Sequence, residues 1–219
     1  MKTLMKLILI KSIKHRNKNY NWQIMIYARL SYNSNNWQKP SGPKGKSKSK
    51  STFEAVSGFG FEEWIFDFDK QIDGYHYGYI EGFHENSKVK KYFDKPLKLY
   101  TLKQNKSNRT TKYFVASIKK WEYVSFCENR KIIEQYNHKG WIEEMMRQLH
   151  LHKLDLNFYI EQLIGVLDKR KPFNEKQLFN IRFKIKECKF DFIDQDLLNS
   201  KMTTSCPAYK AKRFNLIIN

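Results

Sequence analysis

Alternation of apolar and polar residues predicts that much of this chain forms β-strands. The strictest alternation lies at residues 179–186, where apolar side chains occupy every second position and polar or basic ones the positions between. Runs rich in β-branched and aromatic residues predict further strands at 7–10, 23–30, 97–102, 112–118 and 214–218. The third and fourth of these are joined by the polar segment 103–111, which predicts a hairpin with a basic tip.

A second pattern places tyrosines and glycines on opposite faces of a predicted strand. On a strand over residues 75–83, Tyr75, Tyr77 and Tyr79 fall on one face, whereas Gly78 and Gly82 fall on the other. A face without side chains lets a second backbone or a ligand approach closely. The glycine face is therefore predicted to lie against another segment or a ligand.

Apolar residues spaced by three and four predict a helix or a helical turn within residues 61–72 and helices over 128–136, 141–149 and 155–167. The turn-forming pair Asp73 and Gly74 ends the first helix, and Asp155 is placed to cap the amino terminus of the last. Strands and helices in this order predict an α+β fold. We expect a curved, mainly antiparallel sheet or a small barrel, closed by the final strand, with helices packed at one side.

The length of the chain predicts one domain rather than two. A chain of 219 residues can bury a substantial core. The first acidic residue is Glu54, so the amino-terminal quarter carries only positive charge. We therefore divide the chain into a basic extension at 1–24 and a single domain at 25–219 that contains a flexible basic loop at 39–51.

The amino-acid composition gives the chain a strong positive charge. The 41 Lys and Arg residues against 22 Asp and Glu give a net charge of +19, which favours DNA or RNA as a partner over an acidic membrane surface. In residues 39–51 lysine alternates with serine and glycine, which is typical of a loop that neutralises phosphates, or of a plain linker. The predicted phosphate contacts are Lys39, Lys44, Lys46, Lys48, Lys50, Lys103, Lys106, Arg109, Arg182 and Lys184.

The segments on either side of this loop are dense in aromatic residues. Stacking of a base on an aromatic ring contributes about 1–3 kcal/mol in proteins that bind single strands. The candidate base-binding residues are Trp37, Phe59, Phe61, Trp64, Tyr75, Tyr77 and Tyr79. Aromatic residues on one strand face also pack internally, so a place in the core is the alternative for each of them.

A short acidic group raises the question of catalysis. Glu62, Glu63, Asp67 and Asp69 lie close in sequence, and Mg²⁺ prefers carboxylate oxygens. They are candidates for a metal-dependent nuclease, or else form a solvated helical face. Otherwise no metal or cofactor is predicted, because the pair His150 and His152 lacks further ligands.

Other features indicate the cytoplasm. The three cysteines have no metal-like or redox-like spacing, which favours a reducing compartment. No apolar run approaches the roughly 20 residues that span a bilayer. We therefore expect no membrane partner.

Four segments resemble parts of bacterial modules associated with restriction endonucleases. They are residues 25–30 (MIYARL), 57–66 (SGFGFEEWIF), 73–80 (DGYHYGYI) and 180–184 (NIRFK). The resemblance implies a DNA-recognition module, similar to the PUA-like and EVE-like barrels that accept a modified base or to the B3-like barrels that read a sequence. It assigns the pocket role to Phe59, Phe61, Trp64, Tyr75, Tyr77 and Tyr79. The histidine-asparagine-histidine motif of the associated nucleases is not found here, so cleavage would come from a separate nuclease subunit or from a site that the motifs do not reveal, or would not occur at all.

The leading hypothesis is therefore a DNA-binding module of a restriction or phage-defence system. It would bind double-stranded DNA and read a modified or specific base through an aromatic pocket. One alternative is a small Mg²⁺-dependent nuclease of the restriction type that uses the acidic group. Another is an accessory protein that binds RNA.

Overall fold

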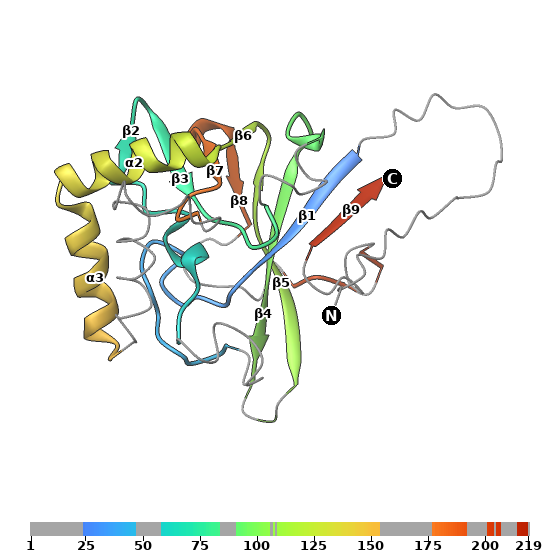
Figure 1. Cartoon of the computed structure of the whole chain (residues 1–219). Coiled ribbons are helices and arrows are strands. Elements are labelled where there is room, and N and C mark those ends of the chain that lie inside the picture. Colours follow the sequence, from blue (N-terminus) through green and yellow to red (C-terminus); the bar gives the residue numbers. More distant parts are fainter. Residues whose placement is uncertain are drawn as a thin grey trace, which may run out of the picture.

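The computed structural model describes residues 24–46, 58–83, 91–105, 107, 109–153, 177–191, 201–203, 205–206 and 214–218. Within them the chain forms two β-sheets, two α-helices and short 3-10 helices (Figure 1). The strand predicted at 7–10 and the helix predicted at 155–167 lie outside the described residues, as does nearly all of the basic extension.

The larger sheet has five strands in the order β8-β5-β4-β1-β9. They are β1 (Ile24–Leu30), β4 (Leu97–Gln104), β5 (Thr110–Ile118), β8 (Cys188–Phe190) and β9 (Phe214–Ile218). Only β1 and β4 are parallel neighbours; the other pairs are antiparallel. Because β8 and β9 form opposite edges, the described sheet is not closed into a barrel, and β9 does not close it as predicted.

The smaller sheet has the order β2-β3-β7-β6, with antiparallel neighbours throughout. Its strands are β2 (Gln71–Ile72), β3 (Tyr75–Gly78), β6 (Trp121–Tyr123) and β7 (Ile181–Phe183). The α+β fold with mainly antiparallel sheets is therefore confirmed.

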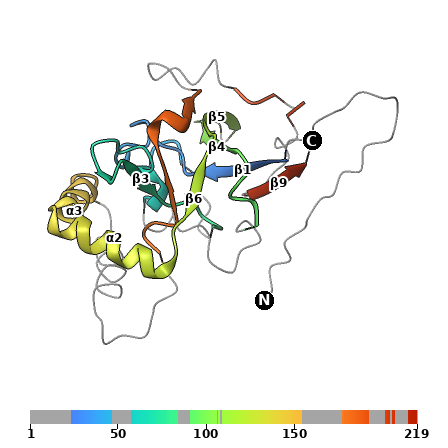
Figure 2. The same ribbon diagram turned by 90° about the horizontal axis from the view of Figure 1, so that it is seen from above.

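The two helices cover one face of the smaller sheet (Figures 1 and 2). Helix α2 (Phe126–His138) begins after Ser125, whose side chain accepts a hydrogen bond from the Glu128 backbone. Helix α3 (Trp141–Leu151) follows Gly140, which has a φ of +73° and so turns the chain between the helices. Both helices were predicted, and so was their position at one side of the sheets.

Two apolar clusters hold these layers together. One lies between the sheets and includes Ile26, Leu99 and Ile181. The other lies between the smaller sheet and the helices and includes Tyr77 and Ile133. A third, smaller cluster covers the opposite face of the larger sheet: Tyr27, Tyr100 and Met202, with Met25, Leu102, Phe114 and Cys206 packed against it.

Of the helix or helical turn predicted within residues 61–72, the structure contains only a helical turn. A 3-10 helix spans Phe61–Trp64, and the chain then turns into β2. The backbone N–H of Phe66 donates to the carbonyl of Trp37 at 2.9 Å, so it makes no helical hydrogen bond at that point. Asp73 and Gly74, both with positive φ, form the tight turn between β2 and β3.

The two strands predicted from alternation are shorter than expected. β3 ends at Gly78, where a Cβ would lie 2.6 Å from a side-chain carbon of Ile65. The predicted close approach on the glycine face is therefore confirmed there. β7 ends at Phe183 and is followed by a 3-10 helix (Ile185–Glu187) whose first residue is 45% exposed.

Candidate nucleic-acid interface

The β4–β5 hairpin extends beyond the rest of the larger sheet. Pairing of β1 with β4 ends where Leu30 lies opposite Thr101, whereas β4 and β5 stay paired as far as Gln104 and Thr110. Residues 102–104 of β4 and 110–112 of β5 pair with each other and with no other described strand (Figure 1, lower ends of β4 and β5). The carbonyl of Lys112 also accepts a hydrogen bond from the backbone N–H of Met202 at 2.9 Å. We call residues 102–112 the ribbon.

The loop after β1 packs against this ribbon. The backbone N–H of Gln104 donates to the carbonyl of Gly45 at 3.0 Å. Gly45 has a φ of +83°, and a Cβ there would lie 2.5 Å from the ring of Tyr32, so the position requires glycine. Lys103 Nζ lies 5.3 Å from the centre of the same ring, within range of a cation–π interaction. The basic loop and the basic hairpin tip therefore meet at one end of the molecule.

Three predicted phosphate contacts are exposed at this end: Lys44 from the loop, and Lys103 and Arg109 from the ribbon. Lys39 is exposed farther along the same loop, where its carbonyl accepts a hydrogen bond from Asn33. The predicted contacts Lys48, Lys50 and Lys106 lie outside the described residues.

Lys46 was expected to contact phosphate but is buried. Only 4% of its surface is exposed, and its ammonium lies 2.5 Å from Glu63 Oε1 and 3.0 Å from the carbonyl of Gly58. Because this charge is already paired inside the protein, we correct its assignment from phosphate contact to structural ion pair.

Glu63 was a candidate metal ligand, and its two oxygens are instead engaged by the protein. Besides Lys46, the carboxylate accepts hydrogen bonds from the Asn33 side chain at 2.8 Å and from the backbone N–H groups of Ser41 and Gly60, both at 2.9 Å. The side chain is fully buried. It therefore anchors the loop that carries Lys39 and Lys44.

The other three acids of the group are dispersed. Glu62 is buried and accepts a hydrogen bond from Ser31 Oγ at 3.4 Å. Asp67 pairs with Lys70 at 2.6 Å, and burial raises its pKa; Asp69 is exposed. Within the described residues, no group of three or more His, Cys, Asp or Glu side chains is arranged to hold a metal ion.

Four of the seven candidate base-binding residues are core residues, which is the alternative that the sequence also allowed for them. Trp37, Phe59, Trp64 and Tyr77 are at most 5% exposed and belong to the two main apolar clusters. The indole N–H of Trp64 donates to Gln148 at 2.6 Å. These rings have no exposed face on which a base could stack.

The other three are half-buried. Phe61 and Tyr79 contact each other edge to face, with ring centres 5.7 Å apart. Tyr75 lies beside the cations of Arg182 and Lys184, at 4.7 and 4.6 Å from the ring centre. They keep a role in base binding as a prediction; Tyr75 lies on β3 of the smaller sheet, and Tyr79 directly follows that strand.

Arg182 was predicted to contact phosphate and is held by two carboxylates instead. Its guanidinium donates to Glu122 at 2.8 and 2.5 Å and to Glu128 at 2.5 Å. Pairs of this kind occupy the donors that a phosphate would need. The structure therefore does not bring Arg182 and Lys184 together with the basic loop.

His76 is buried in the smaller sheet. It is 1% exposed, and its ring meets Phe68 edge to face at 5.0 Å. Burial lowers its pKa below the usual 6.5, although the backbone of Asp67 opposes this effect. Its surroundings are those of a core residue.

The low pKa of His76 predicts a loss of stability in acid. Below about pH 6.5 the unfolded chain binds a proton at this residue before the folded chain does, so the free energy of unfolding falls as the pH falls. We expect urea unfolding between pH 7.5 and pH 5 to show a smaller fall for His76→Met than for the wild type. The exposed-site variant His138→Met should behave like the wild type; an unchanged fall in His76→Met would contradict the assignment.

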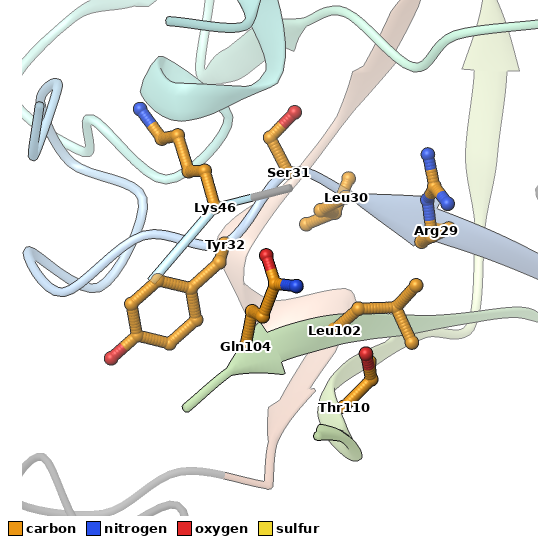
Figure 3. Close-up of a pocket in the computed structure, with 8 residues that line it drawn as sticks. All are labelled: Arg29, Leu30, Ser31, Tyr32, Lys46, Leu102, Gln104 and Thr110. Carbon is orange, nitrogen blue, oxygen red and sulfur yellow. The ribbon is translucent and has the colours of Figure 1, made fainter. Parts of the chain in front are cut away.

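A cavity of about 110 Å³ lies at the foot of the ribbon, where the carboxyl ends of the parallel strands β1 and β4 adjoin (Figure 3). Arg29, Tyr32, Gln104 and Thr110 contribute to its wall. The sequence prediction missed it because its residues come from three separate segments. The one local signal was Arg29, a cation inside an otherwise apolar strand.

No protein-family model, curated protein or solved structure matches this chain. In the described residues, no helix is both long and apolar enough to cross a membrane.

Proposed function

We propose that this protein is a DNA-binding module that holds duplex DNA with the ribbon and the adjoining loop. The observation that carries the proposal is the convergence of Lys44, Lys103 and Arg109 on a hairpin that extends beyond its sheet. The excess positive charge of the chain supports it, because a net charge of +19 attracts a polyanion.

The shape of the ribbon favours a duplex over a single strand. The major groove of B-DNA is about 12 Å wide and admits a two-stranded β-ribbon. Cations at the tip and in the flanking loop would then contact the phosphates on the groove edges, which fixes position without reading sequence. Recognition of single-stranded RNA depends mainly on exposed aromatic rings, and four of the seven candidate rings are buried.

The proposal includes a role in restriction or phage defence. This part rests on the four segments that resemble modules associated with restriction endonucleases. Base reading in this setting would use Phe61, Tyr75 or Tyr79, the candidate rings that are half-buried rather than core. In the described residues nothing favours the nuclease alternative, because Glu63 and Asp67 are engaged in ion pairs.

Charge removal at the ribbon tests the proposal. The triple variant Lys44→Gln, Lys103→Gln and Arg109→Gln should bind every duplex about 500-fold more weakly at 0.1 M salt. Each lost phosphate contact lowers the slope of log K against log salt by about 0.9, so three contacts amount to about 2.7 log units relative to 1 M salt. Fluorescence anisotropy over a salt series measures both quantities.

A control triple variant has the same net charge as the ribbon variant. Lys119→Gln, Lys120→Gln and Lys131→Gln remove three exposed cations, two from the turn that follows β5 and one from α2. This control should lose much less affinity. Equal losses of affinity in the two triple variants would rule out the ribbon as the binding site. Tighter binding of single-stranded RNA than of duplex DNA would favour the RNA alternative.

A further inference from the structure

The ribbon has two edges, one formed by β4 and one by β5 (Figure 1). A ribbon in the major groove of a duplex has a phosphate backbone along each edge. The loop that carries Lys44 runs along the β4 edge, Lys103 belongs to β4 itself, and Arg109 lies at the tip. None of these three cations lies along the β5 edge, which would face the second strand of the duplex.

A short segment from far along the chain lies beside the β5 edge. Lys201 forms an antiparallel bridge with Tyr113, and the backbone N–H of Met202 donates to the carbonyl of Lys112 at 2.9 Å. Met202 is 2% exposed and belongs to the third apolar cluster. The hydrogen bond and the burial of Met202 together hold the neighbouring Lys201 at the ribbon.

The register places Lys201 on the same face of the ribbon as Lys103. Directly opposite residues on neighbouring strands share a face, so Lys201 lies on the face of Tyr113, and Tyr113 on the face of Thr101. Lys103 follows Thr101 by two residues on β4 and therefore lies on this face too. The burial of Met202 in the cluster on the other face agrees, because successive residues of an extended chain alternate.

Lys201 has a charge that is available to a ligand. It is exposed, and in the described part of the chain its ammonium takes part in no ion pair, hydrogen bond or cation–π contact. Lys112, the nearest lysine on β5, differs: its Nζ lies 5.8 Å from the centre of the Tyr100 ring, and burial lowers its pKa. Lys201 is therefore the better phosphate contact at this edge.

The separation of Lys103 and Lys201 matches the width of the groove. Lys103 is opposite Thr111, which precedes Tyr113 by two residues, and Tyr113 is opposite Lys201. Two steps of about 4.8 Å between chains and two of about 3.4 Å along them put the two lysine Cα atoms about 12 Å apart. The major groove of B-DNA is also about 12 Å wide. Lysines at this separation reach phosphates on opposite sides of one groove.

We propose that Lys201 contacts the second strand of a DNA duplex, so that the ribbon lies across one major groove with Lys103 at one side and Lys201 at the other. The inference rests on the proposed DNA binding. It assigns one DNA strand to each edge of the ribbon. A protein that holds both strands prefers a duplex, because a single strand has only one backbone to offer.

Removing the charge of Lys201 tests this arrangement. Lys201→Gln should bind duplex DNA about eightfold more weakly at 0.1 M salt and lower the slope of log K against log salt by about 0.9, the effect of one lost phosphate contact. It should bind a single strand of the same length as tightly as the wild type does, because the β4 edge holds that one backbone. Lys103→Gln should weaken the binding of both. Fluorescence anisotropy over a salt series measures each affinity.

Two variants control for unspecific charge and for misfolding. Lys189 is exposed on β8, which also pairs with β5, but it lies opposite Ser117, beyond the ribbon. Lys189→Gln should therefore keep the duplex affinity of the wild type. Lys201→Arg keeps the charge and should also bind like the wild type, with unchanged circular dichroism; a loss equal to that of Lys201→Gln would refute the role of the charge.

The outcomes separate the inference from the proposed function. Duplex binding that falls in the ribbon triple variant but not in Lys201→Gln would overturn the inference and leave the proposed function standing. Equal losses for duplex and single strand in Lys201→Gln would overturn the assignment of Lys201 to the second strand. A wild-type protein that binds no duplex DNA would refute the proposed function, and the inference with it.

Discussion

Replacing Glu63 with glutamine is expected to lower the free energy of unfolding by about 3–5 kcal/mol, the cost of breaking one partner of a buried ion pair. The change leaves the ammonium of Lys46 buried and without its counter-charge. It also weakens the acceptor for Asn33 and for two backbone N–H groups. Urea unfolding followed by circular dichroism measures the loss.

A double variant separates the ion pair from the rest of the site. Adding Lys46→Met to Glu63→Gln removes the stranded charge, so the double variant should be more stable than Glu63→Gln alone. Glu143→Gln is the matched control, since Glu143 is exposed on α3, and should change stability by less than about 0.5 kcal/mol. A loss of less than about 1 kcal/mol in Glu63→Gln would show that the buried pair has little importance for stability.

The same ion pair connects stability to the proposed interface. Glu63 holds the backbone of Ser41 and the side chain of Lys46, which flank Lys44 on the basic loop. A loop anchored at both sides presents its cation to the phosphates in a fixed place, and less conformational entropy is lost on binding. We infer that residues 41–46 of the basic loop are held in place by the protein, which would preorganise Lys44 for the proposed phosphate contact.

Sequence predicted the elements whose hydrogen bonds are local. The hairpin of β4 and β5 follows from two β-rich runs around a polar turn, and α2 and α3 follow from their apolar spacing, because neighbouring residues decide both patterns. A full helix over 61–72 does not form because a distant carbonyl, that of Trp37, accepts the hydrogen bond of Phe66. Single-sequence patterns contain no information on such a contact.

The candidate site was predictable only in part, for the same reason. The positive charge of Lys44, Lys103 and Arg109 is visible in the sequence, but their convergence depends on the backbone contact between Gly45 and Gln104. Lys46 resembles its neighbours in sequence, and only the fold shows that it is buried. Exposure and partners, which decide whether a cation can bind phosphate, are tertiary properties.

Asn180 provides a second test of what holds the fold together, away from the interface. Its side-chain amide donates to the carbonyl of Ile80 at 2.8 Å and accepts from the N–H of the same residue at 2.9 Å. Ile80 is fully buried in the cluster between the sheets. Loss of the amide leaves two buried backbone groups unpaired, each at about 1–3 kcal/mol, so Asn180→Ala should lower the free energy of unfolding by about 3 kcal/mol.

Two further variants determine whether the missing hydrogen bonds cause this loss. Asn180→Leu refills most of the space without restoring the hydrogen bonds, so it should remain nearly as unstable as Asn180→Ala in urea unfolding; recovery to wild-type stability would assign the loss to packing instead. Asn137→Ala, an exposed asparagine on α2, should change stability by less than about 0.5 kcal/mol. Because Asn180 lies outside the basic loop, folded Asn180→Ala should keep the affinity of the wild type for DNA, whereas Glu63→Gln should weaken it. The two variants thereby separate the stability of the core from the anchoring of the loop.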